Sequence, residues 1–349
     1  MFELLQSAPR LLLEQDLQPI QGSRFQPTGF PDLGAADFRR ADGQRMLLVE
    51  SAQSVANRLE KTCLQGDGPH LDAKLDGIPY VVAKLSGAVE TETSSLIEAH
   101  RINSPWIISD DVFRKKFKEK SGYAPGEPLA WDKIAAALFH FDPNSLVHGV
   151  FMANLDDGRV RLPRALSGFI EAYDIVEAVS GGVKNNPLDP TGTIRAKNYD
   201  KDVYSNVPYA RVEYTAGRIV AYFNLDLALI RGYGMAPAAE EFLIALALLK
   251  VRRLISAGLR LRTACDLAAT QEIRVTAPAE FPLPSEANLL KAVQSGIKAC
   301  ATANLFASPA ITTIQATAVK KASPTGNPNV AKPAEANQPQ GGETEGITG

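Results

Sequence analysis

The sequence predicts an α+β fold in which a β-sheet packs against one central buried helix and carries large insertions. Residues 237–255 have helical spacing and are apolar nearly all round, which is typical of a helix that is buried on every side. Residues 80–85, 209–215 and 218–227 are rich in β-branched and aromatic side chains, which favour strands. A chain of 349 residues can bury such a core in one large domain or in two ordinary ones.

The first elements are expected around a loop that proline and glycine dominate. Residues 17–25 alternate weakly between apolar and polar side chains and predict the first strand, which ends in the loop at residues 22–34. A helix around residues 47–62 follows, because apolar side chains recur there at helical spacing. Residues 80–85 then predict the second strand.

The middle of the chain predicts an insertion followed by a mixture of helix and strand. Residues 86–130 are expected to form the insertion, with a helix at 90–100. Helical spacing at 131–141 predicts another helix, and the apolar run at 145–152 predicts a strand. Residues 165–179 fit either a helix or a strand, and a strand is favoured near their end.

Residues 180–208 have a different character from the rest of the chain. They are rich in glycine, proline, asparagine and aspartate and poor in apolar side chains, so they cannot build a core. We therefore expect a projecting loop or hairpin here. The strands at 209–215 and 218–227 are expected to pair with each other around Ala216-Gly217.

The C-terminal part completes the sheet and ends in a tail. The helix at 237–255 should stop near Gly258, and a strand near 272–276 and a helix at 286–303 follow. Residues 320–349 have almost no apolar content and are expected to be disordered. This order of elements is compatible with a ferredoxin-like or RRM-like sheet with insertions, although periodicity alone leaves that topology open.

The charge of the chain is balanced overall but segregated locally. A net charge of −2 argues against a surface that binds nucleic acid everywhere, so any nucleic-acid contact must be a local groove. No acidic residue lies between Glu241 and Asp266, whereas several basic residues do. They are Lys250, Arg252, Arg253, Arg260 and Arg262.

Cysteine usage and the N-terminal residues indicate the compartment. Cys63, Cys265 and Cys300 are isolated, without the paired spacing of a zinc site or a disulfide framework, and are expected to be buried thiols. The N-terminus resembles neither a signal peptide nor a membrane span, because acidic residues flank its very short apolar run. A cytoplasmic protein is expected.

No catalytic motif stands out in the sequence. The histidines have no metal-site spacing, and neither a Walker loop, a nucleophile elbow nor a complete GxGxxG follows a predicted strand. Asp200 and Asp202 lie in the projecting segment and fit turn formation better than metal binding. A metal-dependent ribonuclease that uses these two aspartates and a histidine is the alternative, and no cofactor is expected.

Nucleic-acid binding has more support from the residue types. On the projecting segment, basic side chains alternate with tyrosines, which suits phosphates and base stacking; the alternative is a merely soluble loop. Arg260 and Arg262 alternate with leucines and no carboxylate is close in sequence, so RNA phosphates are favoured for this pair. Arg252 and Arg253, at the end of the buried helix, fit either RNA binding or stabilisation of the helix dipole.

The loop at 22–34 and the helix after it supply the remaining candidates. Amide and guanidinium groups beside a glycine-rich loop suit phosphates or base edges, although an arginine on a helix flank is as often paired with a nearby glutamate. The candidate RNA-binding residues are Arg24, Gln26, Gln53, Asn57, Arg58, Lys184, Arg195, Lys197, Tyr199, Arg252, Arg253, Arg260 and Arg262. No catalytic or metal-binding residue is predicted.

Long blocks of the sequence are similar to one known family. In order along the chain they are GSRFQPTGFPDLG, LLVESAQSVANRLE, LPRALSGFIEAYDIVEAVSGGVK, NVPYARVEYT, AYFNLDLALIRGYG and KVRRLISAGLRLRTACDL. Residues 16–305, which contain these blocks, resemble the backbone subunit of type I-G (formerly I-U) CRISPR surveillance complexes. That subunit belongs to the Cas-seven group of the RAMP superfamily, within the GSU-type Csb proteins.

The resemblance implies a fold and a role for the chain. The fold is a single RRM-like domain over 1–319, with a helical finger insertion at about 86–140, a protruding thumb hairpin at about 180–208 and a disordered tail at 320–349. The role is noncatalytic: several copies oligomerise along CRISPR guide RNA in a Cascade-type antiviral complex and present the spacer for pairing with target DNA. The thumb would fold over the guide RNA of the neighbouring copy.

The resemblance also implies partners. They are other copies of the chain, a large subunit, a fused guide-processing subunit and a helicase-nuclease that is recruited on target binding. A standalone RRM-type RNA-binding protein is the remaining alternative, but the predicted strands lack the aromatic pattern of such modules.

Overall fold

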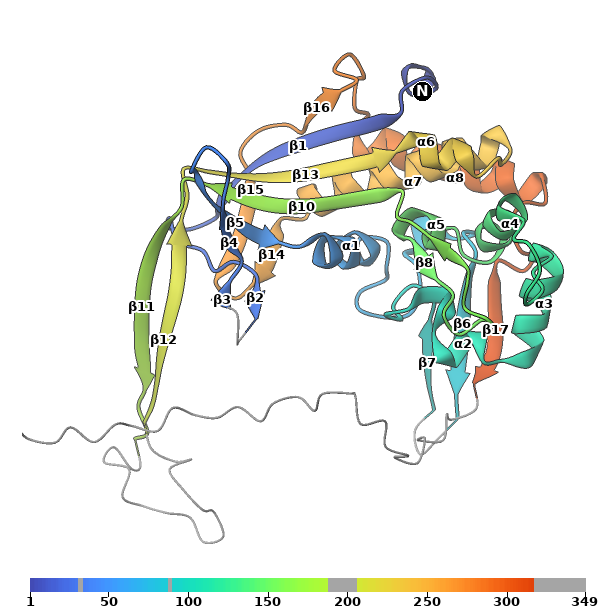
Figure 1. Cartoon of the computed structure of the whole chain (residues 1–349), viewed down its shortest axis with the longest axis horizontal. Helices are drawn as coiled ribbons and strands as arrows, with labels where there is room; N and C mark the ends of the chain where they lie inside the picture. Colours follow the sequence, from blue (N-terminus) through green and yellow to red (C-terminus); the bar gives the residue numbers. More distant parts are fainter. Residues whose placement is uncertain (31–33, 87–89, 188–205, 317–349) are drawn as a thin grey trace, which may run out of the picture.

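The computed structural model describes residues 1–30, 34–86, 90–187 and 206–316 and has an α+β architecture, as predicted (Figure 1). Its main sheet, within the described residues, contains eight strands, seven of them in the spatial order β14-β15-β1-β13-β10-β5-β4, while β16 pairs with β1. The strands of this sheet are β1 (Arg10–Pro19), β4 (Asp37–Arg39), β5 (Arg45–Glu50), β10 (Leu166–Tyr173), β13 (Arg218–Asp226), β14 (Leu259–Arg262), β15 (Cys265–Ala269) and β16 (Arg274–Ala277). All of their pairings are antiparallel.

Two long helices cover one face of the main sheet. The chain reaches them from β13 through the short helix α6 (Leu227–Gly232). Helix α7 (Pro237–Ser256) is buried along most of its length and packs against α8 (Glu286–Thr302). Proline opens α7 at its first turn, and Gly258 follows its end with φ of +78°, a left-handed conformation that glycine adopts at little cost. The predicted central helix and its stop signal are therefore confirmed.

At one point the central strands of the main sheet leave no room for a side chain. Side chains on β1 alternate in burial, so that Leu11, Leu13 and Leu17 face the core. On β10, a Cβ atom at Gly168 would lie 2.7 Å from the ring of Phe223 on β13. Glycine is required there because any side chain would separate the two strands.

A second lobe forms beside the main sheet from residues that are far apart in the sequence (Figure 1). Its three-stranded sheet contains β6 (Tyr80–Leu85), β7 (Thr91–Ser94) and β17 (Ile311–Ala316), in the order β17-β6-β7. β17 runs parallel to β6, so the C-terminal end of the described chain completes the lobe. The other elements of the lobe are the 3₁₀ turn η3 (Arg101–Asn103), α2 (Pro105–Ile108), α3 (Asp111–Ser121), α4 (Trp131–Phe141), α5 (Asn144–His148), β8 (Val150–Phe151) and β9 (Arg161–Leu162).

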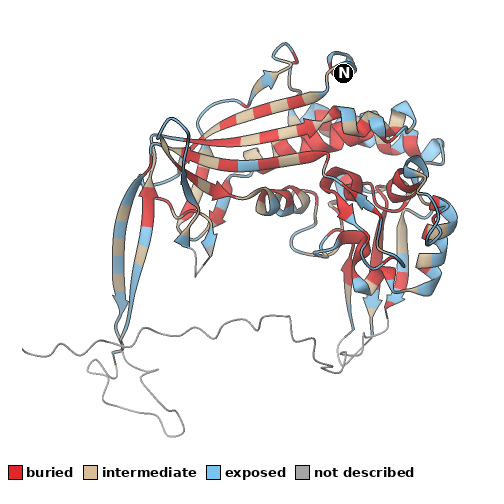
Figure 2. Cartoon of the chain, in the orientation of Figure 1, coloured by how far each residue is buried: buried red, intermediate tan, exposed pale blue. Residues whose placement is uncertain are grey.

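A long hairpin projects from one end of the main sheet (Figure 1). It consists of β11 (Val176–Lys184) and β12 (Val207–Thr215), which pair antiparallel with each other over their whole length. Both strands are largely exposed, in contrast to the sheet from which they project (Figure 2). The sequence predicted a projecting loop or hairpin at residues 180–208; the described strands enter this range at both ends, and residues 188–205 lie outside the described part.

Helix α1 (Ala52–Lys61) lies between the main sheet and the second lobe (Figure 1). Ser51 caps its N-terminus by accepting a hydrogen bond from the Ser54 amide. Immediately before it, the chain forms the small ladder of β2 (Gly29–Phe30) and β3 (Gly34–Ala35) and the edge strands of the main sheet.

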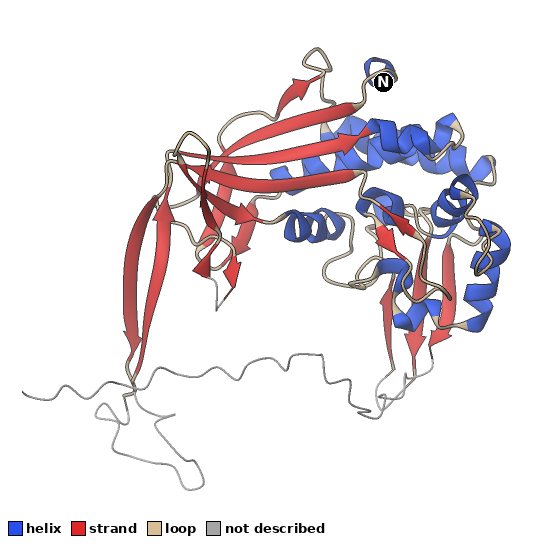
Figure 3. Cartoon of the chain, viewed as in Figure 1, coloured by secondary structure: helices blue, strands red, loops and turns tan. Residues whose placement is uncertain are grey.

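Several predicted elements differ from those observed (Figure 3). The predicted helix at 47–62 is strand β5 followed by α1, because Leu47 and Val49 are buried between the sheet and its cover. The first strand begins at Arg10 instead of residue 17. The predicted helix at 90–100 contains β7, and the predicted strand at 145–152 contains α5 and only two residues of strand.

The pairing predicted for the strands at 209–215 and 218–227 is also wrong. Both strands exist, but β12 pairs with β11 and β13 pairs with β1 and β10. The reason is that Ala216-Gly217 does not form a hairpin turn: the chain leaves the hairpin there and enters the main sheet. On the other strand of the hairpin, the chain passes from β10 of the main sheet into β11 of the hairpin between Tyr173 and Val176.

Candidate nucleic-acid interface

The loop before α1 crosses the base of the projecting hairpin. Phe25 exchanges two backbone hydrogen bonds of 2.9 Å with Tyr214 on β12, and the Gln26 amide donates to the carbonyl of Ala264 at 2.7 Å. Arg24 consequently lies beside the hairpin, where it is 3.4 Å from the carboxylate of Glu213 and about half exposed. The sequence grouped Arg24 and Gln26 with α1, and the structure links Gln26 to this helix through Arg262, which shares the Glu50 carboxylate with Arg58.

Glu50 is the centre of a buried charge cluster next to this loop. Its side chain is 2% exposed, and its carboxylate accepts a hydrogen bond of 2.7 Å from Nε of Arg58 and another from Arg262. Arg58 also donates to the carbonyl of Leu261 at 2.6 Å, and Arg262 donates to that of Gln26 at 2.8 Å. Both arginines thus join β14 to α1 and to the loop.

This cluster revises the argument that favoured RNA phosphates for Arg260 and Arg262. No carboxylate is near them in sequence, but Glu50 reaches Arg262 from a distant strand. Arg260 differs, because its side chain is exposed and, within the described chain, takes part in no ion pair. Of the two residues, Arg260 has the guanidinium that is free to meet a phosphate.

Arg252 and Arg253 are also occupied by contacts within the fold. Arg252 donates to two backbone carbonyls of the segment before α8, at 3.0 and 3.1 Å, and pairs with Glu272 at 3.0 Å. Arg253 donates to the carbonyl of Thr62 and pairs with Asp72 at 3.1 Å. These contacts give both arginines a role in holding α7 to its neighbours, the structural alternative that the sequence left open.

Gln53 and Asn57 form the exposed face of α1. The two side chains are joined by a hydrogen bond of 3.3 Å. Arg164, which precedes β10, donates to the Gln53 side chain and to the Ala52 carbonyl at 3.2 Å. The polar face of α1 that the sequence predicts therefore adjoins Arg164, a basic residue that the sequence analysis did not single out.

A basic cavity of about 690 Å³ opens between α1 and the second lobe. It has no acidic side chain in its lining, whereas arginines and histidines come from three separate elements. We call it the basic cavity and define it by Gln53, His100, Arg101, His148, Phe151, Arg161 and Arg164. Such a lining favours an anionic ligand that spans the junction of the two lobes.

The positive charges of the basic cavity are neutralised to different extents. Arg101 is paired with both oxygens of Glu60, at 2.7 and 2.9 Å. Neither Arg161 nor Arg164 takes part in an ion pair within the described residues. Burial and the neighbouring Arg101 charge lower the pKa of Arg164, and the opposing effect of Glu60 is smaller, so its positive charge lacks full compensation. A bound anion would supply that compensation.

His148 adds an unpaired donor to the wall of the basic cavity. The side chain is fully buried, and its Nε2 accepts a hydrogen bond of 2.7 Å from Nζ of Lys250. Burial and the charge of Lys250 hold the pKa of His148 well below its usual value, so the ring is neutral and carries its proton on Nδ1. That Nδ1 atom is itself buried and has no hydrogen-bond partner in the described structure.

An aromatic platform stands at the mouth of the basic cavity. Phe151 is 44% exposed, and the guanidinium of Arg161 lies 4.1 Å from the centre of its ring. A half-exposed phenylalanine beside an arginine is a surface on which a planar base can stack while the arginine meets a phosphate. The arrangement combines the two kinds of contact that single-stranded nucleic acid offers.

The remaining predicted residues fall in two groups. Lys184 is exposed at the far end of β11. Arg195, Lys197 and Tyr199 lie outside the described residues, as do Asp200 and Asp202 of the ribonuclease alternative. Among the residues that the structure describes, no group of three or more histidine, cysteine or acidic side chains could hold a metal ion. No helix in the same part of the chain is long and apolar enough to cross a bilayer.

The sequence reasoning missed Arg161, Arg164, His148 and Phe151. Phe151, Arg161 and Arg164 lie in short strands and a loop without periodicity, and His148, at the end of the short helix α5, is 47 positions from Arg101. One local signal was available, since the segment RVRLPR around Arg161 and Arg164 contains three arginines and no acidic residue. Only the fold shows that this segment faces Gln53 on α1.

Comparisons with known proteins add the following findings. The family described as CRISPR-associated protein GSU0053 matches residues 11–177, a stretch that runs from β1 through α1 and most of the second lobe to the start of β11. No curated protein matches the sequence. A chain from a structure described as "CRISPR RNA-guided surveillance complex, pre-nicking" is 15% identical, with a TM-score of 0.37 over 84% of this chain and 89% of that one.

Two further solved structures are similar at a comparable level. A chain from a "CRISPR RNA-guided surveillance complex" is 13% identical, with a TM-score of 0.37 over 85% of this chain and 80% of that one. Csc2 of Thermofilum pendens is 8% identical, with a TM-score of 0.30 over 86% of this chain and 81% of that one.

Proposed function

From the match of residues 11–177 to the CRISPR-associated GSU0053 family, we propose that the chain is a noncatalytic subunit that binds CRISPR guide RNA. Several copies line up along the guide as the backbone of a Cascade-type complex of type I-G. Each copy holds the phosphate backbone of the spacer and leaves the bases free to pair with target DNA. Sequence is then read by base pairing, and the protein needs no base-specific contact.

The basic cavity is the observation that carries this proposal. Arg161 and Arg164 have no acidic partner within the described chain, and Phe151 offers a stacking surface beside them. Gln53 and Asn57 on α1 extend the same face with neutral donors. A single-stranded RNA has phosphates for the guanidiniums and planar bases for the aromatic ring.

The topology of the main sheet supports an RRM-like palm. Its four central strands, in the order β15-β1-β13-β10, are all antiparallel. Two crossovers connect them: one from β1 to β10 contains α1, and one from β13 to β15 contains α7. This is the split β-α-β arrangement of ferredoxin-like folds, with two halves that interlock.

We further assign the remaining parts to a finger and a thumb of one domain that spans residues 1–319. The finger is the second lobe, which contains residues 86–140 together with β6, β8, β9 and β17. The thumb is the hairpin of β11 and β12 with the segment between them. In this assignment Lys184, Arg195, Lys197 and Tyr199 reach the guide RNA that a neighbouring copy holds.

The proposal includes partners beyond the guide RNA and further copies of the chain. They are the target DNA, held through the guide, a large subunit, a fused guide-processing subunit and a helicase-nuclease that joins after target binding.

The test is the mass and footprint of the purified chain on guide-length single-stranded RNA, with and without magnesium. We expect several copies to bind one intact RNA, and the double variant Arg161→Ala/Arg164→Ala to weaken binding by about tenfold or more. The matched control is Lys291→Ala/Lys298→Ala, which removes two exposed charges from α8. A single bound copy would instead favour the standalone RRM-type module.

The same experiment separates the enzyme alternative. A metal-dependent ribonuclease would produce RNA fragments only when magnesium is present, and Asp202→Ala would abolish them. Intact RNA under both conditions supports a binding subunit. Equal binding by the arginine variant and by the lysine control would overturn the assignment of the basic cavity.

A further inference from the structure

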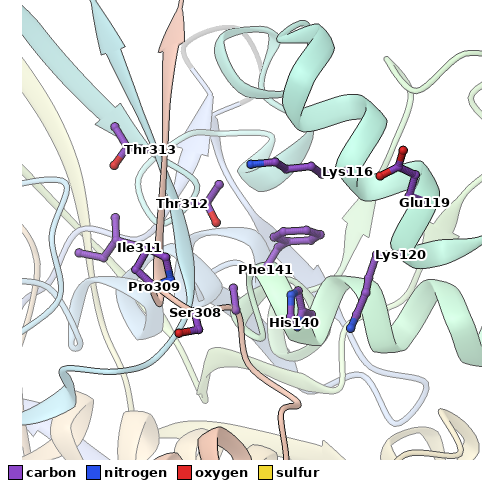
Figure 4. A pocket seen from close by; sticks show the side chains of 11 residues that line it. Lys116, Glu119, Lys120, His140, Phe141, Ser308, Pro309, Ile311, Thr312 and Thr313 are labelled. Atoms are coloured by element: carbon purple, nitrogen blue, oxygen red, sulfur yellow. The ribbon is translucent and has the colours of Figure 1, made fainter.

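A groove lies at the outer edge of the second lobe, on the side of β17 away from β6. Its volume is about 720 Å³, and its walls are α3 and the start of β17. Figure 4 shows Lys116 pointing from α3 toward Thr312, with the ring of Phe141 below both of them and Lys120 extending toward His140. We call it the edge groove and define it by Lys116, Glu119, Lys120, His140, Phe141, Ser308, Pro309, Ile311, Thr312 and Thr313.

β17 presents an open backbone edge to this groove. It is the outermost strand of its sheet, and no described strand pairs with its outer side. The Tyr80 amide of β6 donates to the carbonyl of Ala310. In a parallel pair, successive residues turn their backbone groups alternately toward and away from the neighbouring strand, so this bond shows which residues of β17 face β6. The backbone groups of Thr312 therefore face β6, and those of Ile311 and Thr313 point outward into the groove. An open edge of this kind is a template for another strand.

The opposite wall of the groove is positively charged. Lys116 and Lys120 are exposed and take part in no ion pair among the described residues, whereas Glu119 is paired with Lys115 at 3.9 Å. Burial and the charge of Lys120 lower the pKa of His140, and its Nδ1 donates to the Leu305 carbonyl at 3.1 Å, so the neutral ring leaves Nε2 as an acceptor. The floor is apolar at Phe141.

The spacing of the two lysines matches that of a strand. Lys116 and Lys120 are four residues apart, which corresponds to a rise of about 6 Å along α3. Side chains on one face of a strand recur every second residue, at about 6.6 Å. Two acidic side chains at alternate positions of an extended segment can therefore meet Lys116 and Lys120 at the same time.

We propose that the edge groove binds an extended acidic segment of a partner protein, which adds a strand to β17. This contact goes beyond RNA binding and lies on a different part of the second lobe. A peptide backbone satisfies both the outward amides and the outward carbonyls of β17, whereas the phosphates of a nucleic acid only accept hydrogen bonds. The carboxylates of the segment pair with the lysines and select it among extended chains.

The probe is a fluorescein-labelled peptide of sequence Thr-Glu-Val-Glu-Thr-Glu-Val, titrated against the full chain by fluorescence anisotropy. We expect saturable binding at micromolar to millimolar concentration, as for a short strand added to an edge. Lys116→Glu/Lys120→Glu should weaken it by about fivefold or more, and the matched control Lys291→Glu/Lys298→Glu should leave it unchanged. A peptide with lysine in place of each glutamate should not bind.

A second variant tests the backbone contact and not the charge. Thr313→Pro removes an outward amide while it leaves the ladder to β6 intact, since proline is tolerated on strand edges. We expect peptide affinity to fall by about threefold or more at an unchanged melting temperature.

Three results would overturn the proposal. The first is no saturable binding at peptide concentrations on the order of 1 mM. The second is the same affinity in the wild type and in both groove variants. The third is a different occupant: displacement of the peptide by single-stranded RNA would make the groove a nucleic-acid surface, and dimers that the groove variants abolish would make it a contact between copies of this chain.

Discussion

Nζ of Lys250 lies 2.7 Å from Nε2 of His148, and neither side chain is exposed to solvent. The same ammonium group donates to Oδ1 of Asn144 at 2.6 Å. Lys250 belongs to α7 beneath the main sheet, and its two partners belong to α5 of the second lobe. A single buried cation thus ties the two lobes together directly behind the basic cavity.

We expect Lys250→Met to lower the free energy of unfolding by about 1–3 kcal/mol. The thioether fills the space of the lysine stem, but it leaves Nε2 of His148 and the amide oxygen of Asn144 buried without a donor. Urea unfolding followed by circular dichroism measures the change. Lys291→Met on the exposed face of α8 is the control and should be neutral; an equal change in both variants would show that the buried contact contributes nothing.

The Glu50 cluster leads to a prediction about non-additivity. Arg58→Ala or Arg262→Ala alone leaves the carboxylate with one partner, and each should cost about 1–3 kcal/mol of stability. The double variant leaves a buried carboxylate without a cation, so its cost should exceed the sum of the two. Urea unfolding of the four proteins of this cycle gives the coupling. Strict additivity would contradict the description of the three side chains as one unit.

The sequence predicts the regular elements where a pattern is long. α7, α8 and the strands β6 and β13 follow from helical spacing or from runs of β-branched residues. The errors occur where tertiary burial overrides the local pattern: Leu48 fits a helical stripe with Ala52, Val55 and Leu59, but in the structure it belongs to β5 of the main sheet. Similarly, the switch of β12 and β13 between two sheets leaves no local signal at Ala216-Gly217.

The site is predictable only in part, for a related reason. Residue type identifies arginines, but it cannot show which of them a distant carboxylate neutralises. Arg58, Arg252, Arg253 and Arg262 were candidates for RNA contacts and are all held by partners within the fold. Arg161 and Arg164 were not candidates, although both lack such a partner in the described chain.

Asp142 makes the stability depend on pH in an unusual direction. Burial raises the pKa of this carboxyl from its ordinary value of 3.8 to about 6. The folded chain therefore holds a proton that the unfolded chain has released between about pH 4 and pH 6, so the contribution of Asp142 to stability falls as the pH rises through this window. Above it, ionisation costs on the order of 3 kcal/mol relative to acid conditions.

Asp142→Asn tests this dependence, because an amide keeps the hydrogen bond from the Asn144 backbone without titrating. The free energy of unfolding of the variant, relative to that of the wild type, should increase from pH 4 to pH 6. Urea unfolding at pH values across this range measures it, and other carboxylates cancel in the difference. A difference that is the same at every pH would contradict the raised pKa.

Phe151 provides the sharpest test of how RNA lies on the basic cavity. If a base stacks on this ring, Phe151→Ala should weaken binding of a guide-length RNA by about 1–3 kcal/mol, while Phe151→Trp should preserve it. Because stacking releases no counterions, the slope of log affinity against log salt should be the same in Phe151→Ala as in the wild type. Arg161→Ala should instead reduce that slope by about 0.7, the value for one phosphate of a single strand. Filter binding over a range of potassium chloride concentrations measures both quantities. A reduced slope in Phe151→Ala would mean that the ring acts only by positioning Arg161, whose guanidinium lies over it.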